Sequence, residues 1–407
     1  MAGFITSIES PMPTTSDRST LPAHPSLAFD SAALRAAEFP HLGTTIYLDA
    51  ASIGPLPERT RRAVEAFSLK RAAPHLLGHE DLFGLFAESR RLAARLVNAD
   101  SSEIALTTNT SFGLTIAARA LPLEPGDVIL LSDKEFPANV YPWMRLKSRG
   151  VILELIPTTA EGWPDEHRMM ERLGDPRVRV LAVSLTQFSN GYTVDLARLS
   201  AATRASGAWL VVDAIQSLGQ MPVDLQRTPV DILSCGAQKW LLSPWGAGFM
   251  YVRKELISQL DPVITGWMAF EGTDDFSRMT QYNDTLRNDA RRFELITLPF
   301  QDFAGMNVSL DLLLSIEPAV VREHLRRIHQ PVLEWAARHG VRLASPVGER
   351  GSGIIAVAPP DLERRYRALK PAGVACSLRE GAIRLSPHCY NSVDEMARVA
   401  ALLERNP

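Results

Sequence analysis

Short apolar runs alternate with helical patterns along most of this sequence, and this alternation constrains the fold more than any other feature. Near-continuous apolar strands are typical of a sheet that is covered on both faces. Strand–helix–strand alternation predicts an α/β layer with mostly parallel strands and right-handed crossovers. The predicted strands are Ile104–Thr107, Val128–Ser132, Val151–Ile156, Val180–Leu185, Trp209–Asp213, Ile232–Cys235 and Phe249–Val252.

Apolar residues at three- and four-residue spacing predict helices around these strands. The predicted helices are Glu58–Lys70, Leu82–Asn98, Phe112–Ala120, Leu196–Ala205 and Val393–Arg405. Ser392 is a plausible N-cap for the last of them. A long helical pattern from Ser309 to Gly340 leads into predicted strands at Gly353–Ala358 and Ala382–Ser386.

Changes in composition and in the predicted elements divide the chain into four parts. We predict a flexible extension rich in Ser, Thr and Pro over residues 1–20 and an N-terminal segment over 21–57. A large domain over 58–306 is expected to hold a mostly parallel seven-stranded sheet between helices. A smaller α+β domain is expected over 307–407.

Charge and cysteine content exclude several classes of protein. The 43 basic and 46 acidic residues give a net charge of −3, so we expect no nucleic-acid partner. No run reaches the roughly 18 apolar residues of a membrane span, and no secretory signal is recognisable, which predicts a cytoplasmic protein. Cys235, Cys376 and Cys389 form no C-x-x-C pair. They are expected to be reduced thiols, and we predict neither a disulfide scaffold nor a metal site.

An acid and an amine follow two of the predicted buried strands. Asp213 ends the strand in WLVVDAIQSLG, and Lys239 follows the strand and small-residue turn in ILSCGAQKW. Open α/β sheets bind ligands at the carboxyl ends of their strands. Pyridoxal phosphate needs a lysine for a Schiff base and a carboxylate that keeps its pyridine nitrogen protonated, so this pair suits that cofactor. Taken alone, each residue also fits an exposed strand end or a capped turn.

Several segments in the same order carry a resemblance to a known family. They are YLDAASIGPLP, TTNTSFGL, EFPANVYPW, QFSNGYTVDL, VVDAIQSLGQMPVDL, AQKWLLSPWGAGFMYV and IRLSPHCYN, between Tyr47 and Asn391. The sequence resembles the class V aminotransferase-fold enzymes, which are fold-type I pyridoxal-phosphate enzymes. This group includes cysteine desulfurases, selenocysteine lyases, isopenicillin N epimerases and kynureninases.

The resemblance implies a cofactor, pyridoxal 5′-phosphate, and roles for the residues around it. Lys239 would form the Schiff base and move the proton at Cα, Asp213 would pair with the pyridine nitrogen, and Gln216 would approach the ring hydroxyl. Thr110 and Ser111 would hold the phosphate at a helix N-terminus, although simple N-capping also fits them. The remaining cofactor candidates are Gln187, near the ring hydroxyl or the substrate, and Gln238, near the phosphate.

Two departures from the resembled pattern bear on the reaction. Phe136 stands where the desulfurases have a histidine; phenylalanine can stack on the cofactor ring but cannot move a proton. Lys239 is then the leading proton shuttle. Only EGAI separates Arg379 from Arg384, where the desulfurases carry a mobile loop with a nucleophilic cysteine. Persulfide-forming desulfuration is therefore disfavoured.

The resemblance also suggests where the substrate binds. Arg384 is implied to hold the substrate α-carboxylate, because a guanidinium binds a carboxylate with two parallel hydrogen bonds. Arg379 is a weaker candidate for the same role. His388 either belongs to that site or shapes a turn of the small domain. The side-chain pocket is expected to be built from Ala50–Ile53, which includes Ala51, together with Trp143, Trp267 and residues beyond the dimer axis.

A homodimer with its active site at the interface is also implied. The segment Ile296–Gly305 is expected to reach the partner's site, with Thr297 and Gln301 as its polar candidates.

These expectations describe a pyridoxal-phosphate enzyme that acts on a small α-amino acid through an external aldimine and Cα deprotonation. Aminotransferase chemistry or Cβ elimination of the C–S lyase type would follow. An epimerase or racemase of the isopenicillin N epimerase type is the alternative, as is a non-catalytic regulator that has kept the fold. A dinucleotide-binding dehydrogenase is set aside, since no predicted strand is followed by G-x-G-x-x-G.

Overall fold

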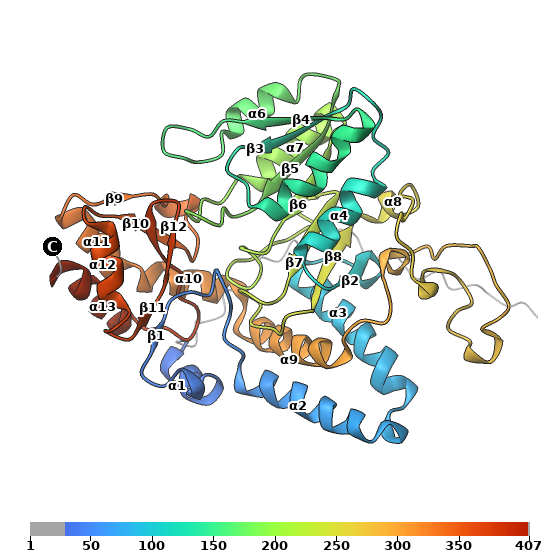
Figure 1. Cartoon of the computed structure of the whole chain (residues 1–407), viewed down its shortest axis with the longest axis horizontal. Helices are drawn as coiled ribbons and strands as arrows, with labels where there is room; N and C mark the ends of the chain where they lie inside the picture. The colour runs from blue at the N-terminus through green and yellow to red at the C-terminus, as the bar shows by residue number, and fades with distance from the viewer. Residues whose placement is uncertain (1–28, 406–407) are drawn as a thin grey trace, which may run out of the picture.

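A seven-stranded sheet forms the centre of the large domain in the computed structural model, which describes residues 29–405 (Figure 1). Its strand order is β2-β8-β7-β6-β5-β3-β4, and only β8 runs antiparallel to its neighbours. The strands are β2 (Ile104–Thr107), β3 (Val128–Ser132), β4 (Ile152–Ile156), β5 (Val178–Ser184), β6 (Trp209–Asp213), β7 (Ile232–Gly236) and β8 (Gly248–Val252). The mostly parallel sheet is therefore confirmed, with a strand at each predicted position.

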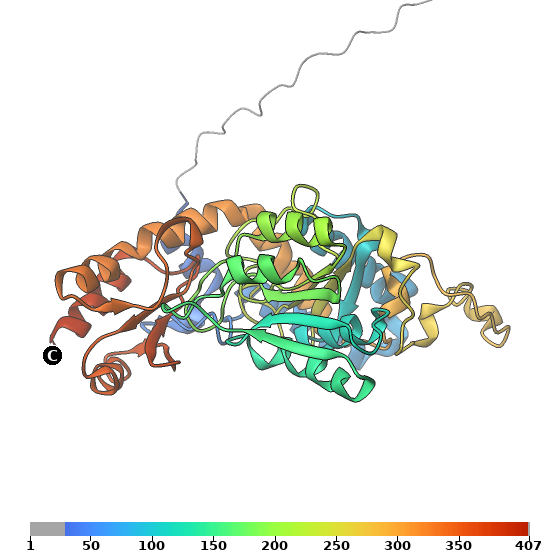
Figure 2. The same ribbon diagram turned by 90° about the horizontal axis from the view of Figure 1, so that it is seen from above.

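Helices cover both faces of this sheet, as the view from above shows (Figure 2). Side chains alternate along β5: Val180 and Ala182 belong to one apolar core, and Leu181 and Val183 belong to the other. This double burial explains the continuous apolar runs in the sequence. The helices of this part of the chain are α2 (Glu58–Ala72), α3 (Leu85–Val97), α4 (Thr110–Ala120), α5 (Tyr141–Met144), α6 (Glu166–Arg172), α7 (Leu196–Ser206) and α8 (Lys254–Ile257).

The C-terminal part of the chain forms a four-stranded antiparallel sheet in the order β12-β13-β10-β9. Its strands are β9 (Arg342–Leu343), β10 (Ile355–Ala358), β12 (Ser377–Arg379) and β13 (Ala382–Leu385), and it is joined by α12 (Leu362–Leu369) and α13 (Val393–Arg405). Ser392 Oγ accepts a hydrogen bond from the Glu395 amide at 3.2 Å, while Glu395 Oε2 accepts one from the Ser392 amide at 3.0 Å. This reciprocal pair confirms the predicted N-cap of α13.

The N-terminal segment packs on this small domain and ends against loops of the large domain, where the Gly54 amide donates to the Gln238 carbonyl at 2.9 Å. The short strand β1 (Ile46–Tyr47) pairs in parallel with β11 (Val374–Ala375). Arg35 in α1 (Ser31–Glu38) forms an ion pair of 3.0 Å with Glu395. The predicted extension over residues 1–20 lies outside the described residues.

The predicted helical pattern from Ser309 to Gly340 is wrong as a single element. It is divided among α9 (Phe300–Ile316), α10 (Pro318–Ile328) and α11 (Gln330–Arg338). Glu317 has a φ of 71° and precedes Pro318, whose missing N–H suits the first turn of a helix but not its interior. The predicted domain boundary at residue 307 falls inside α9, which packs along α2 and α3.

No single helix within residues 29–405 is long and apolar enough to cross a membrane. Only the pair formed by Phe300–Ile316 and Pro318–Arg338 meets the length and composition of a span, and the two are bent by 72°.

Candidate active site

The predicted cofactor residues meet at the edge of the large sheet where its parallel strands end. Asp213 is the last residue of β6, and Lys239 follows the end of β7. Because β2, β3, β5, β6 and β7 run in the same direction, the loops that follow them gather at this edge. These loops contribute Thr110, Ser111, Phe136 and Gln187.

Lys239 is a half-buried amine that lies against an aromatic ring. Its Nζ is 5.3 Å from the centre of the Phe136 ring, and that ring is edge-on to Phe188 at 5.2 Å. Burial lowers the pKa of Lys239 to about 8, with Arg384 and Arg379 lowering it further and Asp213 opposing the change. A lysine must lose its proton to attack a carbonyl carbon, so this environment prepares Lys239 for a Schiff base.

Asp213 is a buried carboxylate with few hydrogen-bond partners. Only 3% of the residue is exposed, and its Oδ1 accepts one hydrogen bond, from the Ile215 amide at 3.0 Å. Burial raises the pKa of Asp213 to about 7, while the Ile215 amide and Lys239 lower it and Glu135 adds to the rise. A buried carboxylate of this kind suits a protonated ring nitrogen as its partner.

The turn between β2 and α4 brings the residues predicted to hold the phosphate close to the end of β7. Thr110 Oγ1 accepts a hydrogen bond from the Gly236 amide at 2.8 Å, and Asn109 Oδ1 accepts one from the Phe112 amide at 2.9 Å. A Cβ at Gly236 would lie 2.6 Å from Gln238 Oε1 and 3.2 Å from the Thr110 nitrogen. Glycine therefore permits the close approach of Gln238 to the N-terminus of α4, where free amides attract a phosphate. Ser111 is exposed at the same turn.

The two glutamines near Asp213 are held in different ways. Gln216 donates from Nε2 to the Ala51 carbonyl at 3.0 Å and accepts at Oε1 from Trp240 Nε1 at 2.7 Å. One Nε2 hydrogen of Gln216 remains for the ring hydroxyl, so its predicted contact stays a prediction. Gln187 donates from Nε2 to Glu135 at 3.0 Å, and its buried Oε1 has no hydrogen-bond partner.

Arg384 is buried within a polar cluster between the small domain and the loop after β1. Its Nη1 donates to the Phe188 carbonyl at 2.7 Å, and its Nη2 donates to Ser52 Oγ at 2.6 Å. Asp49 Oδ1 lies 3.3 Å from Nη2 and also accepts from Ser377. The Nε of Arg384 is buried without a partner. This buried donor is therefore free to bond a ligand.

Arg379 differs from Arg384 in its exposure to solvent and in its hydrogen-bond partners. It is exposed at the end of β12, and its one hydrogen bond goes from Nη1 to the Leu378 carbonyl at 2.9 Å. Glu380 and Gly381 have φ angles of 45° and 74°. These left-handed residues form a two-residue turn that joins β12 directly to β13. No loop between the two arginines is present for a nucleophilic cysteine.

The cysteines themselves are inert. Burial, with a contribution from Asp49, raises the pKa of Cys376 to about 12. Burial also raises the pKa of Cys235 and Cys389, which are both inaccessible to solvent. A thiol acts as a nucleophile only as its thiolate, so these residues do not replace the cysteine of a desulfurase.

The contacts of His388 favour the structural role, which is the second of its two predicted alternatives. Its Nε2 lies 3.0 Å from the Trp240 carbonyl, and its Nδ1 accepts from the Cys389 amide at 2.7 Å. The residue is fully buried, and burial lowers the pKa of His388 to about 4. With both nitrogens bonded to the backbone, His388 fastens the small domain to the loop after Lys239 and has no nitrogen left for a substrate.

Within one chain, the structure separates the residues predicted for the side-chain pocket. Trp143, in α5, is fully buried in the core, and Trp267 lines a separate cavity in the segment before α9. Ala51 does lie near the site, because its carbonyl is bonded to Gln216. Beside Lys239, Phe136 and Ser111 share an open cavity of about 550 Å³ with Tyr141. Tertiary packing thus directs Trp143 inward and leaves Tyr141 exposed.

Thr297 lies three residues before α9, and Gln301 is the second residue of that helix. Thr297 is exposed and Gln301 is half-buried. Within residues 29–405, neither side chain makes a hydrogen bond to another residue, so their predicted contact with a partner subunit is neither supported nor opposed by this chain alone.

Sequence reasoning missed Glu135, Asp49 and Ser377, whereas Ser52 belongs to the segment Ala50–Ile53 that was predicted to line the side-chain pocket. Glu135 adjoins Phe136 inside the EFPANVYPW motif, and Asp49 and Ser52 flank Ala51 in YLDAASIGPLP, so their positions in the motifs were available signals. Nothing in the sequence around Ser377 indicates that it bonds Asp49.

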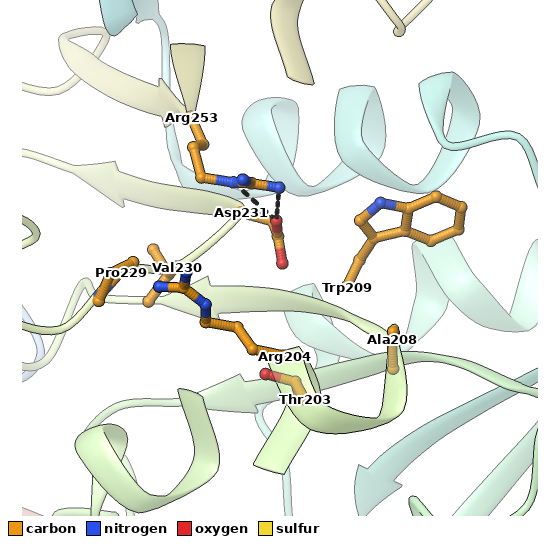
Figure 3. A pocket seen from close by; sticks show the side chains of 9 residues that line it. Thr203, Arg204, Ala208, Trp209, Pro229, Val230, Asp231 and Arg253 are labelled. Carbon is orange, nitrogen blue, oxygen red and sulfur yellow. Dashed lines mark hydrogen bonds and ion pairs between the residues drawn. The ribbon is translucent and has the colours of Figure 1, made fainter. Parts of the chain in front are cut away.

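A second cleft lies at the opposite edge of the same sheet (Figure 3). It has a volume of about 250 Å³ and is lined by residues such as Arg204, Trp209 and Asp231. Asp231 and Arg253 form an ion pair of 2.8 Å there. None of the residues around Lys239 lines this cleft.

The fold and the site together define a pyridoxal-phosphate enzyme of fold type I. The residues fit the cofactor: an amine with a lowered pKa, a buried carboxylate with a raised pKa, and an amide-lined cradle lie at one edge of the sheet. The family model of class V aminotransferases matches residues 46–399. The chain belongs to this family.

Individual relatives agree with this membership. The chain is 30% identical over 308 residues to a protein named uncharacterized aminotransferase YcbU from Bacillus subtilis, covering 76% of this chain and 80% of that protein. It is 31% identical over 384 residues to a probable cysteine desulfurase from Pseudomonas putida, covering 88% and 93%. Its fold is similar to that of a C-DES mutant with glycine covalently linked to its pyridoxal phosphate, with a TM-score of 0.83, 21% identity, and 92% and 99% of the two chains covered.

Proposed function

We propose that this enzyme is an amino-acid aminotransferase in which Lys239 alone moves the proton at Cα. The observation that carries the proposal is the contact between Lys239 Nζ and the Phe136 ring. Phe136 has no titratable group, and the Phe188 ring beside it has none either. A single base favours proton transfer on one face of the substrate, as transamination requires, over inversion, which is most simply served by a base on each face.

Bound pyridoxal phosphate supplies an electron sink that stabilises negative charge at Cα. Lys239 has a pKa of about 8, so a substantial fraction of its amines is neutral near physiological pH and can accept the Cα proton. Asp213 lies at the base of the site, where its carboxyl group either carries a negative charge or holds its own proton. The amides at the N-terminus of α4 hold the phosphate group.

Arg384 orients the substrate. Its partnerless Nε is a donor for the α-carboxylate, and Asp49 and Ser52 hold the guanidinium in place. Because those partners fix Arg384 before substrate arrives, little side-chain entropy is lost on binding. The inert cysteines and the tight β12–β13 turn separate this reaction from persulfide-forming desulfuration.

Cβ elimination begins with the same proton removal, and the experiment distinguishes it. Holoenzyme is incubated in D₂O with a panel of L-amino acids, with and without a keto acid, and the products are identified by mass spectrometry. Transamination predicts a keto product of the donor that appears only with the acceptor keto acid. Release of a β-substituent without an acceptor would show elimination instead. Recovery of deuterated D-amino acid would show epimerisation and contradict the one-base proposal.

The assembly and location are part of this proposal. Thr297, exposed in the segment before α9, supports a homodimer in which each subunit completes the other's phosphate site. Sedimentation of the holoenzyme tests the dimer, and a Thr297→Val variant with weaker cofactor binding tests its contribution. The absence of a membrane span within residues 29–405 supports a cytoplasmic location, which fractionation of cells tests.

A further inference from the structure

The open cavity beside Lys239 carries positive charge without a counter-charge. It has a volume of about 550 Å³, and its walls include Arg119 in α4 and Arg145 directly after α5. No Asp or Glu side chain among residues 29–405 lines it. Neither guanidinium makes a hydrogen bond or an ion pair with another residue in the described part of the chain. Both charges are therefore available to a molecule outside this chain.

The rest of the cavity wall is mostly apolar. Phe136, Tyr141 and Leu146 contribute two rings and an aliphatic side chain, and the two aromatic residues are 39% and 63% exposed. Sites for small molecules combine such apolar walls with a few polar groups that fix the orientation of the ligand. An arginine binds a carboxylate through parallel hydrogen bonds. This cavity therefore suits a hydrocarbon stem that ends in an anionic group.

Two residues connect the cavity to the reactive centre. The Phe136 ring lines the cavity and also lies 5.3 Å from Lys239 Nζ. Ser111 lines it at the first turn of α4, where the phosphate is expected. Arg119 follows Ser111 by eight residues on the same face of α4, about 12 Å further along the helix, and its Cα–Cβ bond tilts back toward the helix N-terminus. A substrate held at Lys239 can therefore extend a long side chain toward Arg119.

We propose that Arg119 and Arg145 bind the side chain of the substrate, and that the substrate is an amino acid whose aliphatic side chain ends in a carboxylate. Arg384 then takes the α-carboxylate, while the apolar wall around Tyr141 covers the methylene groups between the two acids. The inference rests on the proposed function, because it places the amino group of the substrate at Lys239. It names the substrate class and does not depend on which reaction follows.

The test measures binding by the holoenzyme of two matched pairs of amino acids. L-2-aminoadipate is compared with L-norleucine, and L-glutamate with L-norvaline, because the members of each pair have side chains of similar length and differ in charge. Each is titrated without a keto acid, and the change in the absorbance of the bound cofactor gives Kd. The acidic member should bind about ten- to thirtyfold more tightly than its neutral partner.

Variants of the two arginines test which groups produce this preference. Arg119→Gln and Arg145→Gln should each lower the ratio of the two Kd values about threefold, and the double variant should bring the ratio close to one. Arg149→Gln is the matched control. Arg149 ends the short helix that begins at Arg145, but its Nη2 donates to the Leu123 carbonyl at 3.2 Å and it does not line the cavity. This variant should keep the wild-type ratio.

Equal affinity for the acidic and neutral members of both pairs would overturn the inference. So would a dimer that dissociates in Arg119→Gln and Arg145→Gln while the ratio of Kd values stays unchanged, since the cavity would then belong to a subunit interface. A preference for acidic amino acids without a keto product would support the inference and contradict transamination. Transamination of neutral amino acids without a preference would have the opposite meaning, and no binding of any amino acid would contradict both.

Discussion

An aspartate lies at each of the two ends of the parallel strands in the large sheet, and the two aspartates differ in how many partners the protein gives them. Asp231, just before β7, bonds Arg253 at 2.8 Å and accepts from the Leu210 amide at 2.7 Å (Figure 3). Asp213, at the end of β6, accepts from one amide only, and burial raises its pKa to about 7. One carboxylate is satisfied by the protein, and the other is left for a ligand.

This difference shows how one sheet separates stability from chemistry. At the edge in Figure 3, charges meet their counter-charges, which gives a modest structural gain. At the edge with Lys239, burial shifts both an acid and an amine toward neutral pH, where proton transfer is most effective. The reactive edge is therefore expected to lose activity on mutation, and the satisfied edge to lose stability.

The largest effect is expected from Lys239→Ala. Removing the amine removes both the Schiff base and the proton shuttle, and proton transfer alone contributes about 10²–10⁴-fold to such rates. Turnover should fall by at least that factor, and absorbance near ~410–430 nm, the range of a protein-bound Schiff base, should disappear. Arg253→Ala is the control from the other edge and should retain that absorbance. Persistence of the band in Lys239→Ala would contradict the assignment.

The sharpest contrast comes from replacing each aspartate by asparagine. The pKa of Asp213 is about 7 in the folded chain, so between about pH 4 and 7 the folded apoenzyme binds more protons than the unfolded chain. Its stability should therefore fall as pH rises through this window and level off above it. Asp213→Asn should remove that slope and stabilise the apoenzyme at pH 8 by about 2–4 kcal/mol, while turnover of the holoenzyme collapses.

Asp231→Asn should have the opposite effects on stability and turnover. Losing the charged partner of Arg253 should destabilise the protein by about 1 kcal/mol and leave turnover unchanged. Urea unfolding of both apoenzymes at pH 4, 6 and 8 measures the difference. Equal destabilisation by the two substitutions at pH 8 would contradict the contrast between the edges.

A smaller effect is expected when only the pH is changed. Because the pKa of Lys239 is about 8, its neutral fraction grows about tenfold between pH 7 and 9. The rate at which apoenzyme takes up pyridoxal phosphate into its Schiff base should rise by that factor, half-maximal near pH 8. Stopped-flow absorbance measures it. A rate that keeps rising beyond pH 10 would show a lysine with an ordinary pKa.

The smallest effect is expected from Arg379→Gln. This arginine is exposed and reaches only a backbone carbonyl, so it acts on the substrate carboxylate through a screened field. KM for the amino acid should rise about two- to fivefold with kcat nearly unchanged, and the difference should fade in high salt. Arg384→Gln should raise KM far more, because that guanidinium is buried and fixed. Equal effects would show that the exposed arginine shares the carboxylate.

Much of the fold was predictable because local patterns encode it. Apolar runs marked all seven strands, and the run in β5 is continuous because its side chains are buried on both faces of the sheet. The long helix was mispredicted because apolar spacing continues across Glu317, where backbone conformation and Pro318 break it. At the site, Lys239 and Asp213 were found because each follows a buried strand.

The partners of the site residues were not predictable in the same way. Burial and hydrogen bonding join residues far apart in the chain, such as Glu135 with Ser184 or Arg384 with Ser52. Because such contacts cannot be read from the sequence, the role of His388 was ambiguous until its two hydrogen bonds to the backbone were known. For the same reason, Trp143 was predicted to line a pocket, although packing turns its side chain into the core.

The sequence by itself determined the class of enzyme: an alternating α/β chain with a lysine and an aspartate at two strand ends, in a family order of motifs. Only the tertiary structure decided which groups are left unsatisfied. A carboxylate on Asp213 that accepts a hydrogen bond from one amide only, a partnerless Oε1 on Gln187 and a partnerless Nε on Arg384 each result from contacts that the chain makes or omits over long distances. Those omissions define what the site can bind, because a buried polar atom without a partner is stabilised by the ligand that supplies one.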